Sequence, residues 1–271
     1  MQGWDKFIPT EEKIRYINSL LRVGFDTVDF GSFVSPKAVP QMADTREVVS
    51  KLETSQSVSK LLAIVANTRG AEEASTFPQI TYIGFPFSVS ETFQHRNTNS
   101  SITESLDRVG EIHEICTGSG KQLVVYISMG FGNPYGDPFN QEIVFGWVEK
   151  LVAMGIGIIS LADTVGLAAP EQVFDMAGYL IATLPHTEIG VHLHSRADNW
   201  REKIEAAYRA GCRRFDGALN GIGGCPMAGD ALVGNMNTEW TIGYFEEMGV
   251  ETGLDKSALS ASSSLAREIF V

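Results

Sequence analysis

The sequence has few cysteines, no long apolar run and no recognisable targeting segment. Its three cysteines, Cys116, Cys212 and Cys225, form an odd and widely spaced set, which argues against a disulfide framework and favours a reducing compartment. No run of 18 apolar residues occurs, so a transmembrane helix is excluded. The first ten residues lack the pattern of a secretory signal or a transit peptide. We therefore expect a cytoplasmic protein, with the mitochondrial matrix as the alternative if the N-terminus is incomplete.

Basic residues are also scarce. The chain carries 21 Lys and Arg residues against 33 Asp and Glu residues, a formal net charge of −12. A nucleic-acid binder usually shows a basic patch or stripe, so this balance argues against such a partner. The apolar fraction of 44% and the charged fraction of 20% are typical of a globular protein. No linker or low-complexity tract divides the chain, and we expect one domain over residues 1–271.

Short apolar runs rich in β-branched residues alternate with longer amphipathic stretches. The predicted strands cover residues 25–30, 60–66, 80–85, 122–129, 156–162, 188–194 and 213–219. The predicted helices cover residues 10–22, 41–54, 70–76, 103–118, 140–154, 170–184, 199–211 and 238–248, with a last helix in the tail 252–271. This alternation indicates a parallel sheet covered by helices.

The residues at the strand ends decide between an open doubly wound sheet and a barrel. No G-x-G-x-x-G motif follows the first strand, which disfavours a dinucleotide-binding sheet. Polar residues recur where the predicted strands end: Asp29, Asn67, Ser128, Asp163, His192 and His194. Such a ring is typical of the C-terminal face of a TIM barrel. We therefore predict an α/β fold of the TIM (β/α)8 barrel class.

The predicted barrel lacks its first strand. Seven strands are found, and the chain opens in a loop that leads into a helix. Either the natural chain begins before Met1, or the barrel is open between its second and eighth strands.

His192-Leu193-His194 ends the sixth predicted strand. Because side chains alternate across a strand, both imidazoles project to the same side, as adjacent metal ligands require. The alternative is a pair of partly buried histidines that only make hydrogen bonds.

A glycine-rich loop with Cys225 follows the last predicted strand. Three glycines within residues 221–224 allow the backbone to approach a ligand closely. At the tip of such a loop, Cys225 can act as an acid or base, or close over a substrate as part of a lid. The alternative is a tight turn with an incidental cysteine.

Three further polar residues are candidates for the same site. Asn235 supplies an amide oxygen, which is a suitable hard ligand beside imidazoles. Its neighbour Asn237 or Thr238 is typical of a helix N-cap. The carboxylates of Asp29 and Asp163 suit metal support, proton transfer or binding of a substrate hydroxyl, although Asp163 can also cap a turn.

Taken in order, these motifs resemble the 3-hydroxy-3-methylglutaryl-CoA (HMG-CoA) lyase family over essentially the whole chain. Each motif is weak alone, and the ordered set is specific. It consists of residues 32–37 (SFVSPK), 39–42 (VPQM), Asn67 with Arg69-Gly70, residues 90–93 (SETF), 160–166 (SLADTVG), 192–194 (HLH), 223–226 (GGCP), and Gly234-Asn235 with Thr238-Glu239.

The resemblance implies a metal site at His192, His194 and Asn235, completed by the aspartate of an Arg-Asp pair. In the family this pair precedes the position that matches Gln2, so it would lie before Met1. A chain that truly begins at Met1 is therefore expected to have little lyase activity.

The resemblance also implies roles for residues around the metal. Catalytic roles fall on Cys225, His192 and Asp29, and substrate contacts fall on Gln2, Ser160 and Asp163.

Two places in the sequence depart from the family pattern. Asp29 stands where the family usually has glutamate, with Phe30 and Gly31 in place of two small residues, and Asn133 replaces the usual cysteine before Pro134-Tyr135. These differences bear on which substrate the site accepts more than on the type of reaction that it catalyses.

The implied reaction is the metal-assisted cleavage of HMG-CoA to acetoacetate and acetyl-CoA. Mg²⁺ or Mn²⁺ is expected as the cofactor, ahead of Zn²⁺, because the ligand set mixes nitrogen and oxygen and keeps open positions. The expected partner is the acyl-CoA substrate, with no nucleic acid or membrane, and a homodimer is one option for the assembly.

Two alternatives stay open. A metal-dependent Claisen synthase or aldolase of the same superfamily is the nearest, but such synthases usually carry a Gly-Glu-Arg-type loop where this chain has Gly224-Cys225-Pro226. A barrel remnant that binds an acyl-CoA without catalysis is the other, and the absence of metal binding would indicate it.

Overall fold

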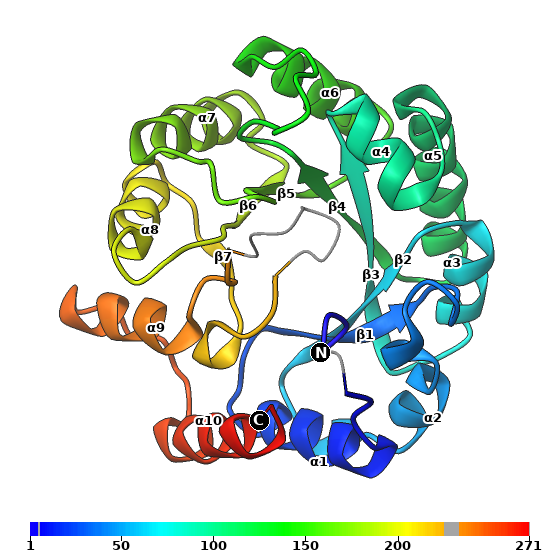
Figure 1. The fold of residues 1–271 in the computed structure, drawn as a ribbon, viewed down its shortest axis with the longest axis vertical. Coiled ribbons are helices and arrows are strands. Elements are labelled where there is room, and N and C mark those ends of the chain that lie inside the picture. Colours follow the sequence, from blue (N-terminus) through cyan, green and yellow to red (C-terminus); the bar gives the residue numbers. More distant parts are fainter. Residues whose placement is uncertain (5, 225–232, 271) are drawn as a thin grey trace.

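The computed structural model describes residues 1–4, 6–224 and 233–270. Parallel strands form one curled sheet, and a ring of helices covers its outer side (Figure 1). The strands are β1 (Thr27–Phe33), β2 (Lys60–Val65), β3 (Ile80–Ser88), β4 (Gln122–Ser128), β5 (Ile158–Ala162), β6 (Glu188–His192) and β7 (Arg214–Asp216). They lie side by side in chain order, with β1 and β7 at the two edges of the described sheet.

The helices alternate with the strands, as the sequence predicts. They are α1 (Thr10–Leu21), α2 (Thr45–Ser50), α3 (Thr68–Ser75), α4 (Glu91–Thr98), α5 (Ile102–Gly118), α6 (Gln141–Ala153), α7 (Pro170–Thr183), α8 (Trp200–Arg209), α9 (Thr238–Glu247) and α10 (Lys256–Ile269), with 3₁₀ turns at Pro40–Met42, Thr54–Gln56 and Leu219–Gly221. Asn237 caps α9 by accepting a hydrogen bond from the Trp240 N–H at 3.0 Å, which confirms the predicted helix start.

Three element predictions were wrong in detail. The predicted helix 41–54 is broken into α2 and two 3₁₀ turns. Helix α4 was missed because its mostly polar sequence shows little apolar periodicity, although Ser90 caps it. The last two strands are shorter than predicted: β6 ends at His192, and β7 covers only Arg214–Asp216.

The core has two layers because alternate residues of each strand face opposite sides of the sheet. Outward residues such as Phe85, Val125 and Ile159 are fully buried beneath the helices. The inner side carries a smaller apolar cluster, made of Leu62, Tyr82, Val124 and Ile158, with Ile64 and Tyr126 packed against it.

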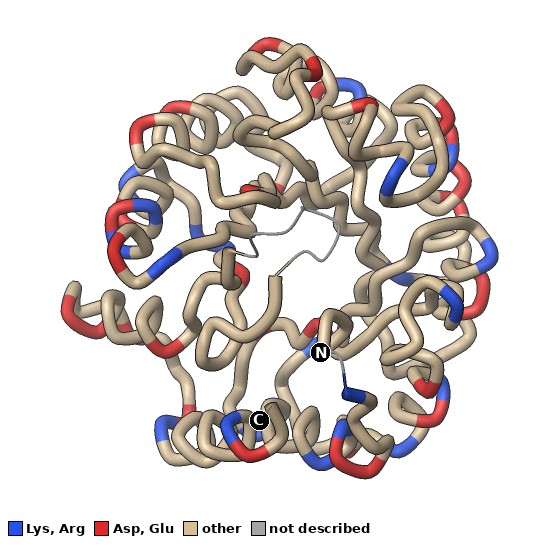
Figure 2. Tube along the Cα trace, viewed as in Figure 1, with Lys and Arg blue, Asp and Glu red and all other residues tan. Residues whose placement is uncertain are grey.

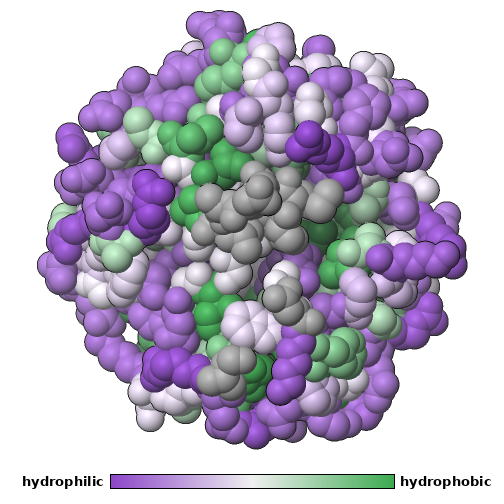
Figure 3. All heavy atoms as spheres, in the orientation of Figure 1, coloured by the Kyte–Doolittle hydropathy of each residue, from purple (hydrophilic) through white to green (hydrophobic). Residues whose placement is uncertain are grey.

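Charge is concentrated on the outside of the molecule. Lys, Arg, Asp and Glu lie mostly along the outer helices (Figure 2). Apolar residues show near the centre of the same face, inside a hydrophilic rim (Figure 3). The formal net charge of −12 is therefore mainly a property of the helical ring, as expected for solvated surface charge. None of the described helices is long and apolar enough to cross a membrane.

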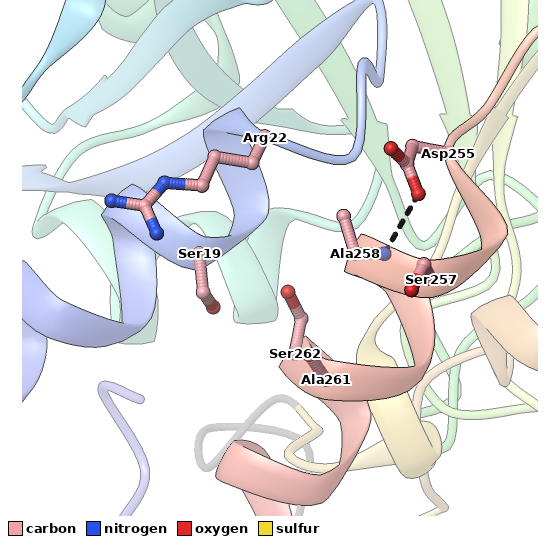
Figure 4. A pocket seen from close by; sticks show the side chains of 7 residues that line it. All are labelled: Ser19, Arg22, Asp255, Ser257, Ala258, Ala261 and Ser262. Carbon is pink, nitrogen blue, oxygen red and sulfur yellow. Dashed lines mark hydrogen bonds between the residues drawn. The ribbon is translucent and has the colours of Figure 1, made fainter.

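A cleft of about 360 Å³ lies on the outer side, between the end of α1 and the start of α10 (Figure 4). Asp255 borders it and caps α10 by accepting a hydrogen bond from the Ala258 N–H at 2.9 Å. Small side chains such as Ser19 and Ala261 leave this space between the helices. It shares no lining residue with the site described below.

Cys116 and Cys212 are free and buried; Cys116 lies in α5, and Cys212 follows α8. Burial raises the pKa of each thiol to about 12. In a Cys225→Ser variant at pH 8, roughly one thiol in ten thousand would then be ionised, and a thiol-specific reagent should label neither cysteine until the protein is unfolded. Fast labelling of the native variant would contradict the burial of these two side chains.

Candidate functional site

His192 and His194 lie together at the C-terminal end of β6. His192 is the last residue of the strand, and His194 follows it in an isolated antiparallel bridge with Asn235. The prediction that the strand extends through residue 194 was therefore wrong, but the two rings still lie 5.5 Å apart between centroids. His192 keeps 34% of its side-chain surface exposed, so it is accessible, whereas His194 is buried.

Each imidazole is anchored through its Nδ1 atom. Nδ1 of His194 lies 3.0 Å from the carbonyl oxygen of Val233, and Nδ1 of His192 lies 3.3 Å from Oδ2 of Asp216. An acceptor at Nδ1 holds the proton there and leaves the Nε2 lone pair for a metal. The arrangement therefore favours histidines that act as ligands over histidines that are merely buried.

The third predicted ligand, Asn235, is oriented in the same way. Its amide nitrogen donates a hydrogen bond to the carbonyl oxygen of Ile222 at 2.8 Å. The amide oxygen is left as the atom that can bind a cation. Backbone bonds from Met236 N to Leu193 O (3.1 Å) and from Ser195 N to Gly234 O (3.0 Å) tie this segment to the end of β6.

Electrostatics keep one of the two imidazoles neutral. Burial and, to a smaller extent, the neighbouring His192 lower the pKa of His194 to about 4. His194 is therefore uncharged at neutral pH, as a metal ligand must be. Partial desolvation also lowers the pKa of His192, but the hydrogen bond and charge of Asp216 outweigh this effect, so the pKa of His192 is raised.

Asp29 faces the inner side of the sheet. The sequence predicts it at the end of a strand, but it is the third residue of β1, so this part of the prediction was wrong. Asp29 pairs in register with Leu62, just before a bulge between Asp29 and Gly31. The side chain is exposed to solvent on this inner side. Desolvation inside the curled sheet and, to a smaller extent, the charge of Asp216 raise the pKa of Asp29 to about 7.

The sequence did not single out Asp216, although the structure places its carboxylate beside Nδ1 of His192. Besides His192, it accepts a hydrogen bond from Ser160 Oγ at 3.4 Å. Arg214 and Asp216 are two residues apart on β7, so the alternation rule places them on one face, but it does not show that this face meets His192. Ser160, which is predicted to contact the substrate, is fully buried beside Asp216.

The other predicted residues lie in different surroundings. Asp163 is buried, and its two carboxylate oxygens accept hydrogen bonds from Lys203 Nζ (2.7 Å) and Ala168 N (3.0 Å). Gln2 is exposed in an N-terminal turn, and no hydrogen bond between described residues joins it to His192, His194 or Asn235. Cys225 lies outside the described residues. The roles of all three stay predictions.

The departure at Asn133 has a structural explanation. Its side-chain oxygen accepts hydrogen bonds from Tyr135 N (3.0 Å) and Asp137 N (3.1 Å), and its nitrogen donates to Asp137 O (3.0 Å). A cysteine could not make these three bonds. Asn133 therefore shapes the loop after β4, and Asp137 at the end of this loop accepts a hydrogen bond from Thr92 N at the start of α4 (2.9 Å).

The described donor set suits a divalent cation. No group of three His, Cys, Asp or Glu side chains that could hold a metal occurs among the described residues. The donors at the end of β6 are instead two imidazoles and one amide oxygen. Such a set leaves coordination positions open for a substrate, as catalytic metal sites require.

The comparisons with known proteins decide the family. The model of the HMGL-like family matches residues 1–266 of this chain. The chain belongs to the HMGL-like family. An (R)-citramalyl-CoA lyase of Chloroflexus aurantiacus is 33% identical over 93% of this chain and 81% of its own length. A hydroxymethylglutaryl-CoA lyase of Bacillus subtilis is 32% identical over 99% of this chain and 89% of its own length.

Solved structures agree with this assignment. An HMG-CoA lyase from Brucella melitensis superposes with a TM-score of 0.91 at 31% identity and covers 99% of this HMGL-like chain and 94% of its own. An HMG-CoA lyase from Acinetobacter baumannii, in complex with coenzyme A and 3-methylmalate, gives a TM-score of 0.92 at 32% identity, over 99% of this chain and 87% of its own. The predicted barrel class and the predicted enzyme class, a carbon–carbon lyase, are thereby confirmed for this HMGL-like protein.

Proposed function

We propose that this HMGL-like lyase cleaves 3-hydroxy-3-methylglutaryl-CoA to acetoacetate and acetyl-CoA, with Mg²⁺ or Mn²⁺ bound by His192, His194 and Asn235. One observation carries the proposal. The two histidines are held through Nδ1, and Asn235 is held through its side-chain nitrogen. This leaves Nε2 of each histidine and the amide oxygen of Asn235 as donors for a metal. The complex of the Acinetobacter lyase with coenzyme A supports an acyl-CoA as the substrate class.

The chemistry requires that the tertiary hydroxyl loses its proton as the carbon–carbon bond breaks. A bound divalent cation supplies Lewis acidity that lowers the pKa of such a hydroxyl. Asp29 is suited to take the proton, because a base works best when its pKa is near the working pH and the pKa of Asp29 is raised to about 7. The electron pair of the broken bond forms the thioester enolate. Cys225 is the predicted donor of the proton that converts this enolate to acetyl-CoA.

Citramalyl-CoA is the second candidate substrate, because a citramalyl-CoA lyase is 33% identical to this chain. This thioester has one methylene fewer between its tertiary carbon and its carboxylate. A single methylene typically changes kcat/KM by ~10–200-fold in a fitted pocket. The two candidates should therefore be clearly separable by their kinetics.

The test uses the full-length natural protein with Mg²⁺ or Mn²⁺ and each thioester in turn. We expect acetoacetate and acetyl-CoA from HMG-CoA, with kcat/KM at least ~10-fold above that for citramalyl-CoA. Pyruvate released faster from citramalyl-CoA would move the assignment to the second candidate. Cleavage of neither thioester, with both metals present, would overturn the proposed function.

A further inference from the structure

We infer that Lys203 and Asp163 form a positioning pair that holds the backbone of both histidine ligands, an inference that rests on the proposed metal site. Lys203 lies on α8, and Asp163 follows β5. Their charged groups are 2.7 Å apart, and the two side chains are 2% and 1% exposed. Such complete burial of an ion pair is costly and requires further hydrogen bonds to its members.

Those hydrogen bonds lead directly to the two histidines. Lys203 Nζ donates to the carbonyl oxygen of His194 at 2.9 Å. The backbone N–H of Asp163 donates to the carbonyl oxygen of His192, also at 2.9 Å. Each member of the pair therefore holds the peptide group of one predicted ligand, and the ion pair joins the two attachments.

The same pair fixes the loop between β5 and α7. Asp163 Oδ1 accepts a hydrogen bond from Ala168 N at 3.0 Å, and Lys203 Nζ also donates to Gly166 O at 3.3 Å. Both carboxylate oxygens are thus engaged within the protein, so Asp163 acts through the histidines rather than by contacting substrate. The buried ammonium group of Lys203 therefore connects α8, the loop after β5 and the end of β6.

This arrangement matters because His194 lies beyond the last ladder bond of β6. Its backbone is held by the bridge to Asn235 and by Lys203, rather than by regular strand pairing. Removing Lys203 should let the His194 ring drift from the position that it shares with His192. Loss of partners outside the ligand set typically weakens metal affinity ~10–100-fold.

The experiment measures Mn²⁺ binding to the metal-free full-length protein by calorimetry, beside its thermal unfolding. We expect Lys203→Met to raise the Kd for Mn²⁺ by ~10–100-fold. The matched control is Lys13→Met, which removes another buried lysine: Lys13 lies on α1 and pairs at 2.7 Å with Asp44, the residue just before α2. This control should lose stability and keep the Mn²⁺ affinity of the unaltered protein.

A double variant protects the test against simple misfolding. Lys203→Met combined with Asp163→Asn leaves no unpaired buried charge, yet it still lacks the donor to His194. We expect it to fold and to bind Mn²⁺ as weakly as Lys203→Met, whereas Asp163→Asn alone retains the lysine and much of the affinity. Recovery of the unaltered Kd in the double variant, or an equal Kd for Lys203→Met and the unaltered protein, would overturn the inference alone. Failure of the unaltered protein to bind Mn²⁺ would overturn the proposed metal site and the inference together.

Discussion

Replacement of His194 by glutamine is expected to abolish stoichiometric Mn²⁺ binding and to lower kcat by at least ~10³-fold. His194 offers Nε2 as a neutral donor, because burial lowers its pKa to about 4 and Val233 O holds its Nδ1 proton. Metal assistance supplies several kcal/mol of transition-state stabilisation, and each ~1.4 kcal/mol corresponds to a tenfold change in rate. Steady-state kinetics with HMG-CoA and Mn²⁺ titration of the variant measure the two effects.

His95→Gln is the control for this substitution. His95 is an exposed imidazole on α4 that lies 3.3 Å from Glu91. Its replacement should leave Mn²⁺ affinity and kcat within about twofold of the unaltered protein, since exposed pairs of this kind contribute little. A His194→Gln variant that folds normally and still binds Mn²⁺ tightly would remove the proposed metal site.

The barrel class could be predicted from the sequence because each strand is a short apolar run bounded by amphipathic helices. Parallel strands buried on both faces give such runs without alternation, and Ile158–Ala162 is buried along its whole length. Helix α4 could not be predicted in this way, because its sequence has little apolar periodicity. Its start is fixed by the adjacent N-cap Ser90, which accepts a hydrogen bond from Phe93 N, and by Asp137 from a distant loop, which accepts one from Thr92 N. Neither contact gives a periodic apolar pattern in the sequence.

The candidate site was predictable only where its geometry is local. His192 and His194 are two residues apart, so their proximity follows from the strand repeat. The contact between His192 and Asp216, which are 24 positions apart in the sequence, depends on the register of β6 against β7, and the sequence does not reveal this register. The same holds for Lys203: on α8 it resembles any helical lysine, and only the fold shows that it is buried against Asp163.

Asp216→Asn is expected to lower kcat by at least ~10²-fold. The Asp216 carboxylate can only accept a hydrogen bond from His192, which keeps the proton on Nδ1. An amide can present its NH₂ group instead and favour the tautomer with the proton on Nε2, the atom proposed to bind the metal. In a Ser-His-Asp triad the equivalent substitution costs ~10⁴-fold through the wrong tautomer, and partners outside a metal's ligand set typically cost ~10–100-fold.

The matched control for Asp216→Asn is Glu188→Gln at the opposite end of the same strand pair. Glu188 is half exposed and lies 3.3 Å from Arg214, so its loss removes a carboxylate from these strands without touching either histidine. We expect kcat to change less than threefold in this control, because partly exposed ion pairs contribute about 1 kcal/mol or less. If Asp216→Asn and Glu188→Gln behaved alike in HMG-CoA kinetics, the proton on His192 would be held by something other than Asp216. If only Asp216→Asn lost turnover while its fold remained intact, the carboxylate would be acting through the imidazole that it contacts.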